Sequence, residues 1–111
     1  MGIGGLWNVP RTPDELSVWS FDHAAQHRIE IAAIYRDFGV TLTEYRLDPL
    51  NPNDFATWIY QHQVMENQRN SVLGIAGYDL TGVDWNDPAS FEAFIFDNAT
   101  IHQQAATILR L

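Results

Sequence analysis

The chain has 111 residues, of which 46% are apolar, and it contains no cysteine. This length and composition predict one compact domain with a real core, and they exclude a disulfide framework or a thiolate site. The formal charge of −8 at pH 7 argues against nucleic acid and against an anionic membrane surface as direct partners, because both attract lysine and arginine.

The first eleven residues, MGIGGLWNVPR, form a glycine-rich arm whose one aromatic side chain is Trp7. Such an arm is expected either to be free or to dock, on its own domain or on a neighbouring molecule. We therefore divide the chain into an N-terminal arm over residues 1–11 and a single domain over residues 12–111.

Three later stretches each begin with a helix-capping residue followed by proline. Proline suits the first helical position, where the N–H has no partner anyway, and Thr, Asn or Asp just before it can cap the free N–H groups. These pairs are Thr12–Pro13, Asn51–Pro52 and Asp87–Pro88. Glycines 39 and 74 follow the first two stretches, where the left-handed end of a helix favours glycine. We predict helices over residues 13–37, 52–73 and 88–109.

The connections between these helices are long. Residues 40–51 alternate briefly and could hold a short extended piece. Residues 75–86 are rich in glycine and aspartate, and their aromatic residues Tyr78 and Trp85 are expected to hold the loop against the helices.

The three stretches are copies of one repeat. Counted from each proline, aromatic residues stand at positions six and eight, His or Asn at position ten, and His or Glu at position fourteen. At about 100° per residue, positions three, ten, fourteen and twenty-one fall within about 20° of one direction. Each helix thus carries one stripe that is apolar at both ends and polar in the middle. The polar residues of the stripes are His23, His62 and Asn98 at position ten, and His27, Glu66 and His102 at position fourteen.

Matching stripes on three helices predict an all-α fold, a three-helix bundle with long ordered connections. The stripe must face the bundle axis, because it contains the apolar residues that need burial. The six polar side chains would then meet in one layer in the middle of the core. Such a layer is unfavourable unless its members satisfy one another.

A hydrogen-bonded structural layer is the preferred interpretation of these residues. Each neutral imidazole offers one donor and one acceptor, so a ring of His, Asn and Glu can close on itself. Trp19 and Trp58, at position six, could shield it from water. A buried polar layer of this kind can specify helix order at some cost in stability.

A metal site is the second interpretation, since neutral imidazole and carboxylate suit zinc or another divalent ion. The candidate ligands are His23, His27, His62, Glu66 and His102. Acid–base catalysis by Glu66 and a histidine is the third interpretation. The chain has no nucleophile motif and no glycine-rich phosphate loop, so we do not expect an enzyme.

Two further features accompany the stripes. Glu30 and Arg69 share position seventeen and are expected to face each other as an exposed ion pair, which contributes little to stability. The aromatic residues at position eight lie on another face, where they either pack beneath the connections or form a contact surface. With the arm, the candidate interaction residues are Trp7, Phe21, Tyr60 and Phe96.

Four segments of the chain resemble a family of small, mostly unassigned proteins encoded among the virion and tail genes of tailed bacteriophages. The segments are WSFDHAAQHR, HQVMENQRNSVLGI, GYDL and FIFDNATIHQQAATIL, and the resemblance covers residues 16–111. In that family a second histidine usually stands where this chain has Glu66, a departure that weakens the metal interpretation for this member. The resemblance implies a structural part of a phage particle and carries over no catalytic residue.

The sequence therefore leads us to expect a non-enzymatic component of a tailed phage particle, such as a connector, tail or decoration subunit. It would act through contacts with other virion proteins, in multiple copies, without a cofactor. Its expected location is the virion, after synthesis in the cytoplasm of the bacterial host, because the chain shows no signal-peptide pattern. The alternative is a metal-binding helical domain or a metalloenzyme built on the His/Glu layer.

Overall fold

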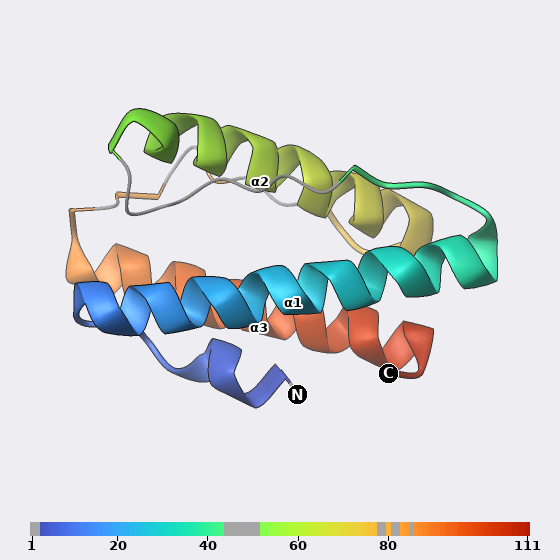
Figure 1. Ribbon diagram of the computed structural model, residues 1–111, viewed down its shortest axis with the longest axis horizontal. Helices are drawn as coiled ribbons and strands as arrows, with labels where there is room; N and C mark the ends of the chain where they lie inside the picture. The colour runs from blue at the N-terminus through green and yellow to red at the C-terminus, as the bar shows by residue number, and fades with distance from the viewer. Residues whose placement is uncertain (1–2, 44–51, 78–79, 81–82, 85) are drawn as a thin grey trace.

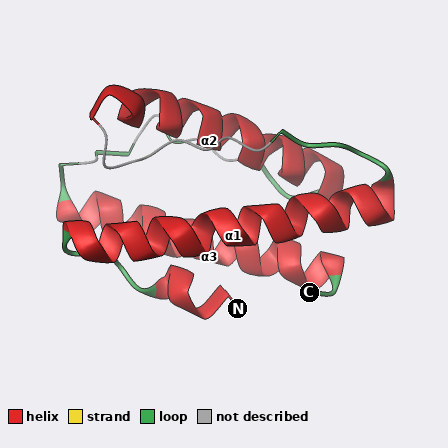
Figure 2. Ribbon diagram, in the orientation of Figure 1, coloured by secondary structure: helices red, strands yellow, loops and turns green. Residues whose placement is uncertain are grey.

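Three long helices and one short 3-10 helix make up the protein. The computed structural model describes residues 3–43, 52–77, 80, 83–84 and 86–111. Its elements are η1 (Ile3–Trp7), α1 (Pro13–Phe38), α2 (Pro52–Leu73) and α3 (Pro88–Leu109). These described residues contain no strand (Figure 2). The prediction of an all-α three-helix bundle is confirmed, and the helix bounds differ from those expected only at the end of α1.

Side-chain caps begin α1 and α3 as the sequence predicts. The Thr12 hydroxyl accepts a hydrogen bond from the N–H of Glu15 at 3.1 Å. The Glu15 carboxylate in turn accepts from the N–H of Arg11 at 3.1 Å, which fixes the end of the arm to α1. Asp87 caps α3 by accepting from the N–H two residues further on. Asn51, the predicted cap of α2, lies outside the described residues.

The helices end in the left-handed conformation. Gly39, with φ of 68°, ends α1 and donates its N–H to the carbonyl of Tyr35 at 3.0 Å. Gly74 follows α2 with φ of 74°. At the end of α3 the left-handed residue is Arg110, with φ of 59°, a conformation that is unfavourable for a residue with a Cβ.

All three helices run in the same direction. In Figure 1 each begins at the left-hand end of the bundle and finishes at the right-hand end. The long connections make this possible: residues 39–51 can span about 40 Å when extended, and a helix of 22 residues such as α2 is about 33 Å long. In parallel helices of equal phase, equal positions of the repeat meet at the same level of the bundle. The threefold repeat in the sequence therefore becomes a stack of matching layers.

Two apolar clusters lie on either side of the polar layer. Near the starts of the helices the buried members are Leu6, Trp19, Leu80, Phe94, Ile95 and Ala99. Near the ends of the helices they are Ala33, Ile34, Leu42 and Leu109. The polar residues between them are thus separated from water along the bundle axis.

The arm docks on its own domain. Leu6 is 1% exposed and belongs to the first apolar cluster, and its carbonyl accepts a hydrogen bond from the Trp19 indole at 3.4 Å. The ring of Trp7 lies 6.3 Å from that of Phe96 on α3, centroid to centroid. This contact joins two of the four predicted interaction residues within one molecule.

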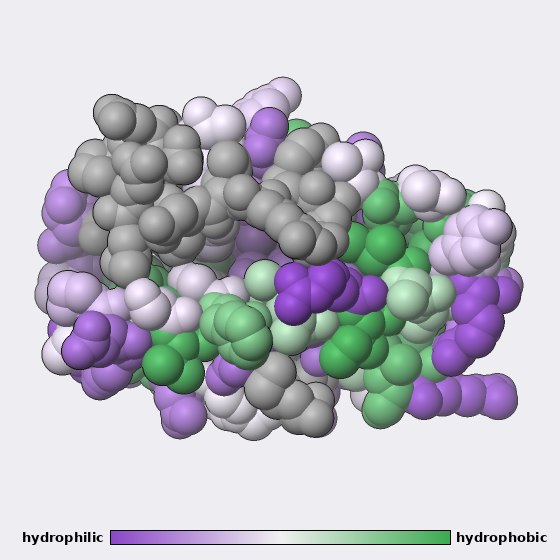
Figure 3. All heavy atoms as spheres, viewed as in Figure 1, coloured by the Kyte–Doolittle hydropathy of each residue, from purple (hydrophilic) through white to green (hydrophobic). Residues whose placement is uncertain are grey.

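The other two interaction residues point outward. Phe21 is 67% exposed and Tyr60 is 69% exposed. On the face shown in Figure 3, hydrophobic side chains gather mainly toward the end where the helices finish, interrupted by hydrophilic ones. Tyr78, Trp85 and most of the predicted extended piece in 40–51 lie outside the described residues. No described helix combines the length and apolar character needed to cross a membrane.

Candidate metal centre

All four histidines of the chain gather in one buried cluster with Glu66. The six predicted layer residues are each at most 4% exposed, and they are His23, His27, His62, Glu66, Asn98 and His102. Each helix contributes two of them, one helical turn apart. Because the helices are parallel, positions ten and fourteen of the repeat come together from all three.

One carboxylate oxygen stands at the centre of the histidines. Glu66 Oε1 lies 3.0 Å from His27 Nε2, 3.1 Å from His62 Nε2 and 3.1 Å from His102 Nε2. The Nε2 atom of His23 is 3.8 Å away. Four side chains from three helices thus direct the same ring nitrogen toward one small region of the core.

The imidazole nitrogens are also close to one another. His23 Nε2 lies 3.0 Å from His27 Nε2 and 3.2 Å from His62 Nε2. One donor atom each from His23, His27, Glu66 and His102 can be chosen so that all four lie within 4.8 Å of one another. Bonds of about 2.1 Å to a single ion place neighbouring ligand atoms about 3.0 Å apart in an octahedron and about 3.4 Å apart in a tetrahedron. The contacts of 3.0–3.2 Å fit ligands around one metal ion as well as hydrogen bonds, whereas the 3.8 Å between Glu66 Oε1 and His23 Nε2 is longer than either.

Hydrogen bonds within the described residues do not satisfy this cluster. Glu66 Oε1 and His102 Nε2 are buried and form an ion pair at 3.1 Å, but the two groups are not aligned for a hydrogen bond. The amide oxygen and nitrogen of Asn98 are also buried, and neither has a hydrogen-bond partner among the described residues. His23 Nε2 has two imidazole neighbours, but it can serve only as one donor or one acceptor at a time. The hydrogen-bonded layer expected from the sequence is therefore present in part, through His23, His27, His62 and the pair of His102 with Glu30.

Glu30 orients one of the histidines from outside the cluster. Its Oε2 lies 2.7 Å from His102 Nδ1 and also accepts a hydrogen bond from Gln26 at 2.9 Å. A carboxylate that holds one imidazole nitrogen leaves the other directed at the centre, and metal-binding histidines commonly have such a partner.

Arg69 joins the two buried carboxylates. Its Nη1 donates to Glu30 at 2.9 Å, and its Nη2 makes a close ion pair with Glu66 Oε2. The Asn70 amide oxygen accepts from Arg69 Nε at 3.1 Å. Glu66 therefore keeps Oε2 on the guanidinium while Oε1 faces the histidines.

The predicted exposed pair of Glu30 and Arg69 is wrong on exposure. The two side chains do face each other, but Glu30 is 1% exposed and Arg69 is 2% exposed. At about 100° per residue, position seventeen lies about 40° from the centre of the buried stripe. The rotation that buries the histidines therefore also buries this pair. Gln26 and Asn70, which the sequence reasoning did not single out, extend the same polar network.

Burial and charge divide the histidines into two kinds. Burial lowers the pKa of His27 to about 4, and burial together with the neighbouring His27 holds the pKa of His23 well below its usual value. Burial opposes protonation of His102 as well, but Glu66 and Glu30 outweigh it and raise its pKa to about 9. The neutral imidazoles of His23 and His27 therefore face the centre beside His102, which is protonated unless a metal ion takes the place of its proton.

The carboxylates are held in their charged form. Burial alone would raise the pKa of Glu66, but His102 and Arg69 bring it well below its usual value. The pKa of Glu30 is lowered in the same way against the effect of burial, first by His102. Charged carboxylates and neutral imidazoles are the forms that bind metal ions.

Two tryptophans cover the cluster on the side of the helix starts. Trp19 stacks on the His23 ring with centroids 4.5 Å apart, and Trp58 stacks on the His62 ring at 5.0 Å. The predicted shielding role of these residues matches this arrangement. The two indole rings fix the orientation of the imidazoles on which they stack and separate these imidazoles from solvent.

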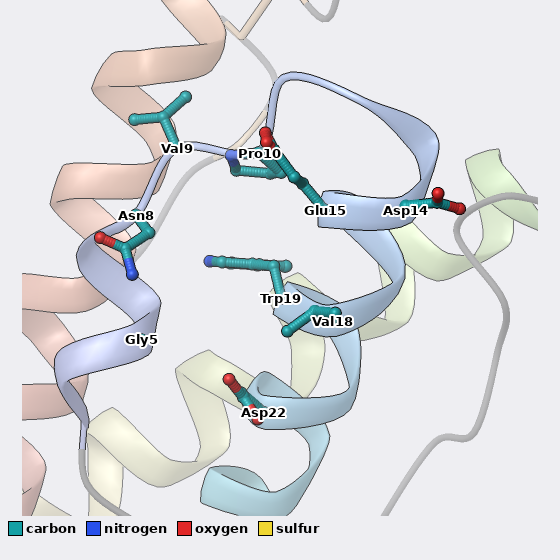
Figure 4. Close-up of a pocket in the computed structure, with 9 residues that line it drawn as sticks. All are labelled: Gly5, Asn8, Val9, Pro10, Asp14, Glu15, Val18, Trp19 and Asp22. Carbon is teal, nitrogen blue, oxygen red and sulfur yellow. The ribbon is translucent and has the colours of Figure 1, made fainter.

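A cavity of about 430 Å³ lies apart from the cluster, between the arm and α1 (Figure 4). It is lined by Gly5, Asn8, Val9, Pro10, Asp14, Glu15, Val18, Trp19 and Asp22. Trp19 borders the cavity and also stacks on His23, so this one side chain contacts both places. The lining holds no histidine and no nucleophile beside a base, and the cluster remains the stronger candidate site.

Comparisons with protein-family models, with curated proteins and with solved structures found no match to this chain.

Proposed function

We propose that this protein is a metal-binding helical bundle, with one divalent transition-metal ion held by four histidines and Glu66. The observation that carries the proposal is the convergence of His23, His27, Glu66 and His102, whose donor atoms lie within 4.8 Å of one another in a dry core. His62 adds a further Nε2 atom, 3.1 Å from Glu66 Oε1 and 3.2 Å from His23 Nε2. Glu66 Oε1 and His102 Nε2 pair at 3.1 Å without hydrogen-bond alignment, which supports the proposal, because a metal ion would be a well-placed partner for both.

The donor set favours particular metals. Imidazole nitrogen suits iron, nickel, copper and zinc, whereas calcium and magnesium prefer oxygen throughout. The cluster offers five candidate donors, one more than the four ligands of a tetrahedral structural site. Iron(II) or another ion that accepts octahedral coordination therefore fits better than a tetrahedral structural zinc ion.

The burial of the site limits what the metal can do. Every ligand is at most 4% exposed, so no polymer, nucleotide or peptide can reach the ion without opening the bundle. The supported roles are holding the helices together and binding molecules of very few atoms. Metal binding also adds to folding stability, because the five ligands come together only in the folded chain.

Elemental analysis and equilibrium dialysis of the untagged protein test this proposal. We expect close to one iron, cobalt or nickel ion per chain and a higher melting temperature in the metal-loaded form. At a free metal concentration of about 100 times Kd, the free energy of unfolding should rise by about 2.7 kcal/mol. His27→Ala removes one ligand and should weaken metal binding at least about 100-fold. This is more than the usual effect of removing a residue that only hydrogen-bonds to a ligand. Gln103→Ala, an exposed change beside His102, is the matched control and should bind like the wild type.

Two results would overturn the proposal. One is less than about a tenth of an ion per chain after reconstitution, with a melting temperature that chelator does not change. The other is equal binding by His27→Ala and Gln103→Ala, which would place the metal outside the cluster.

A role as a structural subunit of a phage particle is the second candidate. The exposed aromatic rings of Phe21 and Tyr60 favour a contact role, because large apolar side chains on a surface often mark an interface. The phage location itself rests on the sequence resemblance. Peptide mapping of purified virions tests it: the chain should be present in many copies, and its absence would remove this candidate. A metal-stabilised bundle is compatible with either outcome.

A further inference from the structure

Six positions of the repeat surround the cluster, and five of them supply metal ligands. Position ten gives His23, His62 and Asn98, and position fourteen gives His27, Glu66 and His102. With three parallel helices, these make two triangles of side chains one helical turn apart. Two triangles around one point offer six positions, so the repeat itself builds a six-position site.

Asn98 stands at the one position without an imidazole or a carboxylate. It occupies on α3 the place that His23 occupies on α1 and His62 on α2. Its side chain is shorter than histidine and fully buried, and neither its amide oxygen nor its amide nitrogen has a hydrogen-bond partner among the described residues. A buried amide left in this condition is unfavourable unless something else in the site pairs with it.

The charges of the site favour an anion. A divalent ion (+2), Glu66 (−1), Glu30 (−1) and Arg69 (+1) sum to +1 with four neutral imidazoles. An uncompensated charge in a dry core is costly, and a bound monoanion would bring the sum to zero.

We propose that the bound metal keeps a sixth coordination position beside Asn98 and takes there an anion of one to three atoms, with the Asn98 amide N–H donating to it. This inference rests on the proposed metal-binding function. Its size limit follows from the burial of every residue around the site. Hydroxide and small linear anions belong to this class.

The test uses the full-length protein loaded with cobalt(II), whose visible absorption reports its coordination, and azide as the probe anion. In the wild type, azide should change the cobalt bands and saturate with one anion per metal. Asn98→His should still bind one cobalt ion but lose the azide response, because the new imidazole completes the octahedron. Asn98→Ala keeps the position open and removes the donor, and it should bind azide about tenfold more weakly, the loss of one hydrogen bond to a charged group.

The outcomes separate this inference from the proposed function. Failure to bind cobalt overturns the metal proposal itself. One cobalt per chain with no response to azide leaves that proposal intact and overturns the sixth position. An unchanged azide affinity in Asn98→Ala, or in a folded Asn98→His, also overturns it, because azide would then be displacing a protein ligand or binding elsewhere.

Discussion

Glu66 organises the cluster because its two oxygens have different partners. Oε2 pairs with Arg69, which in turn holds Glu30, and Oε1 faces three imidazole nitrogens at 3.0–3.1 Å. A carboxylate anchored on one side presents a single fixed oxygen on the other. This is the geometry of a ligand with an outer partner that sets its orientation.

The buried network makes Glu30 a sensitive position. Glu30→Gln preserves the shape but leaves Arg69 with one buried anion fewer, and we expect it to lower the free energy of unfolding of the metal-free protein by about 3–5 kcal/mol. It also replaces the charged partner of His102 Nδ1 with a neutral amide and should weaken metal binding about 10- to 100-fold. Chemical denaturation and metal titration measure the two effects.

Glu92→Gln is the matched control, since Glu92 makes a partly exposed ion pair with Arg11 at 3.0 Å. Exposed pairs of this kind are worth about 0–1 kcal/mol. If the two glutamate variants lose equal stability, Glu30 is not part of a buried ionic network.

At the scale of the helices, the sequence predicts nearly everything that local signals encode. Capped prolines give the starts of all three helices, closing glycines give the ends of α1 and α2, and the repeat gives the end of α3, all to within one residue. The repeat gives the buried face, because equal spacing from each proline fixes the same rotation on every helix.

Other properties of the helices depend on their arrangement in space, and the sequence reasoning left them out. The parallel direction follows from the long return connections together with contacts between equal positions, such as His23 with His62 and Glu30 with Arg69. The burial of Glu30 and Arg69 could have been predicted from the angle of about 100° per residue, which places position seventeen close to the buried stripe. It was missed because charged residues are usually exposed. The orientation of imidazole nitrogens toward one point depends on side-chain rotation, which no spacing rule gives.

The ends of the helices provide a test of local conformation. Arg110 adopts φ of 59°, so Arg110→Gly should remove the strain of its Cβ and raise the free energy of unfolding by about 0.5–1 kcal/mol. Gly39→Ala should have the opposite sign and a similar size, because φ is 68° there while the space for a methyl group is open. Equilibrium denaturation of both variants measures this. Equal signs would mean that φ does not decide stability at these two positions.

At the scale of the whole molecule, the polar layer divides the core into two apolar clusters, and the buried charged side chains lie between them. In the metal-free state, Glu30, Glu66, Arg69 and a protonated His102 sum to zero charge (−1 −1 +1 +1). The layer can therefore remain folded without metal, but only while these four groups keep their charges.

This charge balance predicts how the stability of the metal-free protein depends on pH. The pKa of His27 is about 4 in the folded state against about 6.5 unfolded, so stability falls as pH decreases from about 6.5 toward 4. The lowered pKa values of Glu30 and Glu66 add to the loss in acid. The pKa of His102 is about 9 in the folded state, so its contribution is complete below about 6.5 and is lost as pH rises through 9.

The free energy of unfolding should therefore be highest near pH 6.5 and lower at both pH 5 and pH 8.5. Urea denaturation at these three pH values in the presence of chelator measures it. A steady increase from pH 5 to pH 8.5 would show that His102 is not held protonated by the two carboxylates.

The most direct test of the metal centre is an anomalous difference map from a crystal of the metal-loaded protein, collected at the absorption edge of the metal. We predict one strong peak inside the bundle, about 2.0–2.3 Å from the Nε2 atoms of the four histidines and from Glu66 Oε1. A peak only at surface carboxylates, or an empty cluster with the five side chains unchanged, would contradict the assignment.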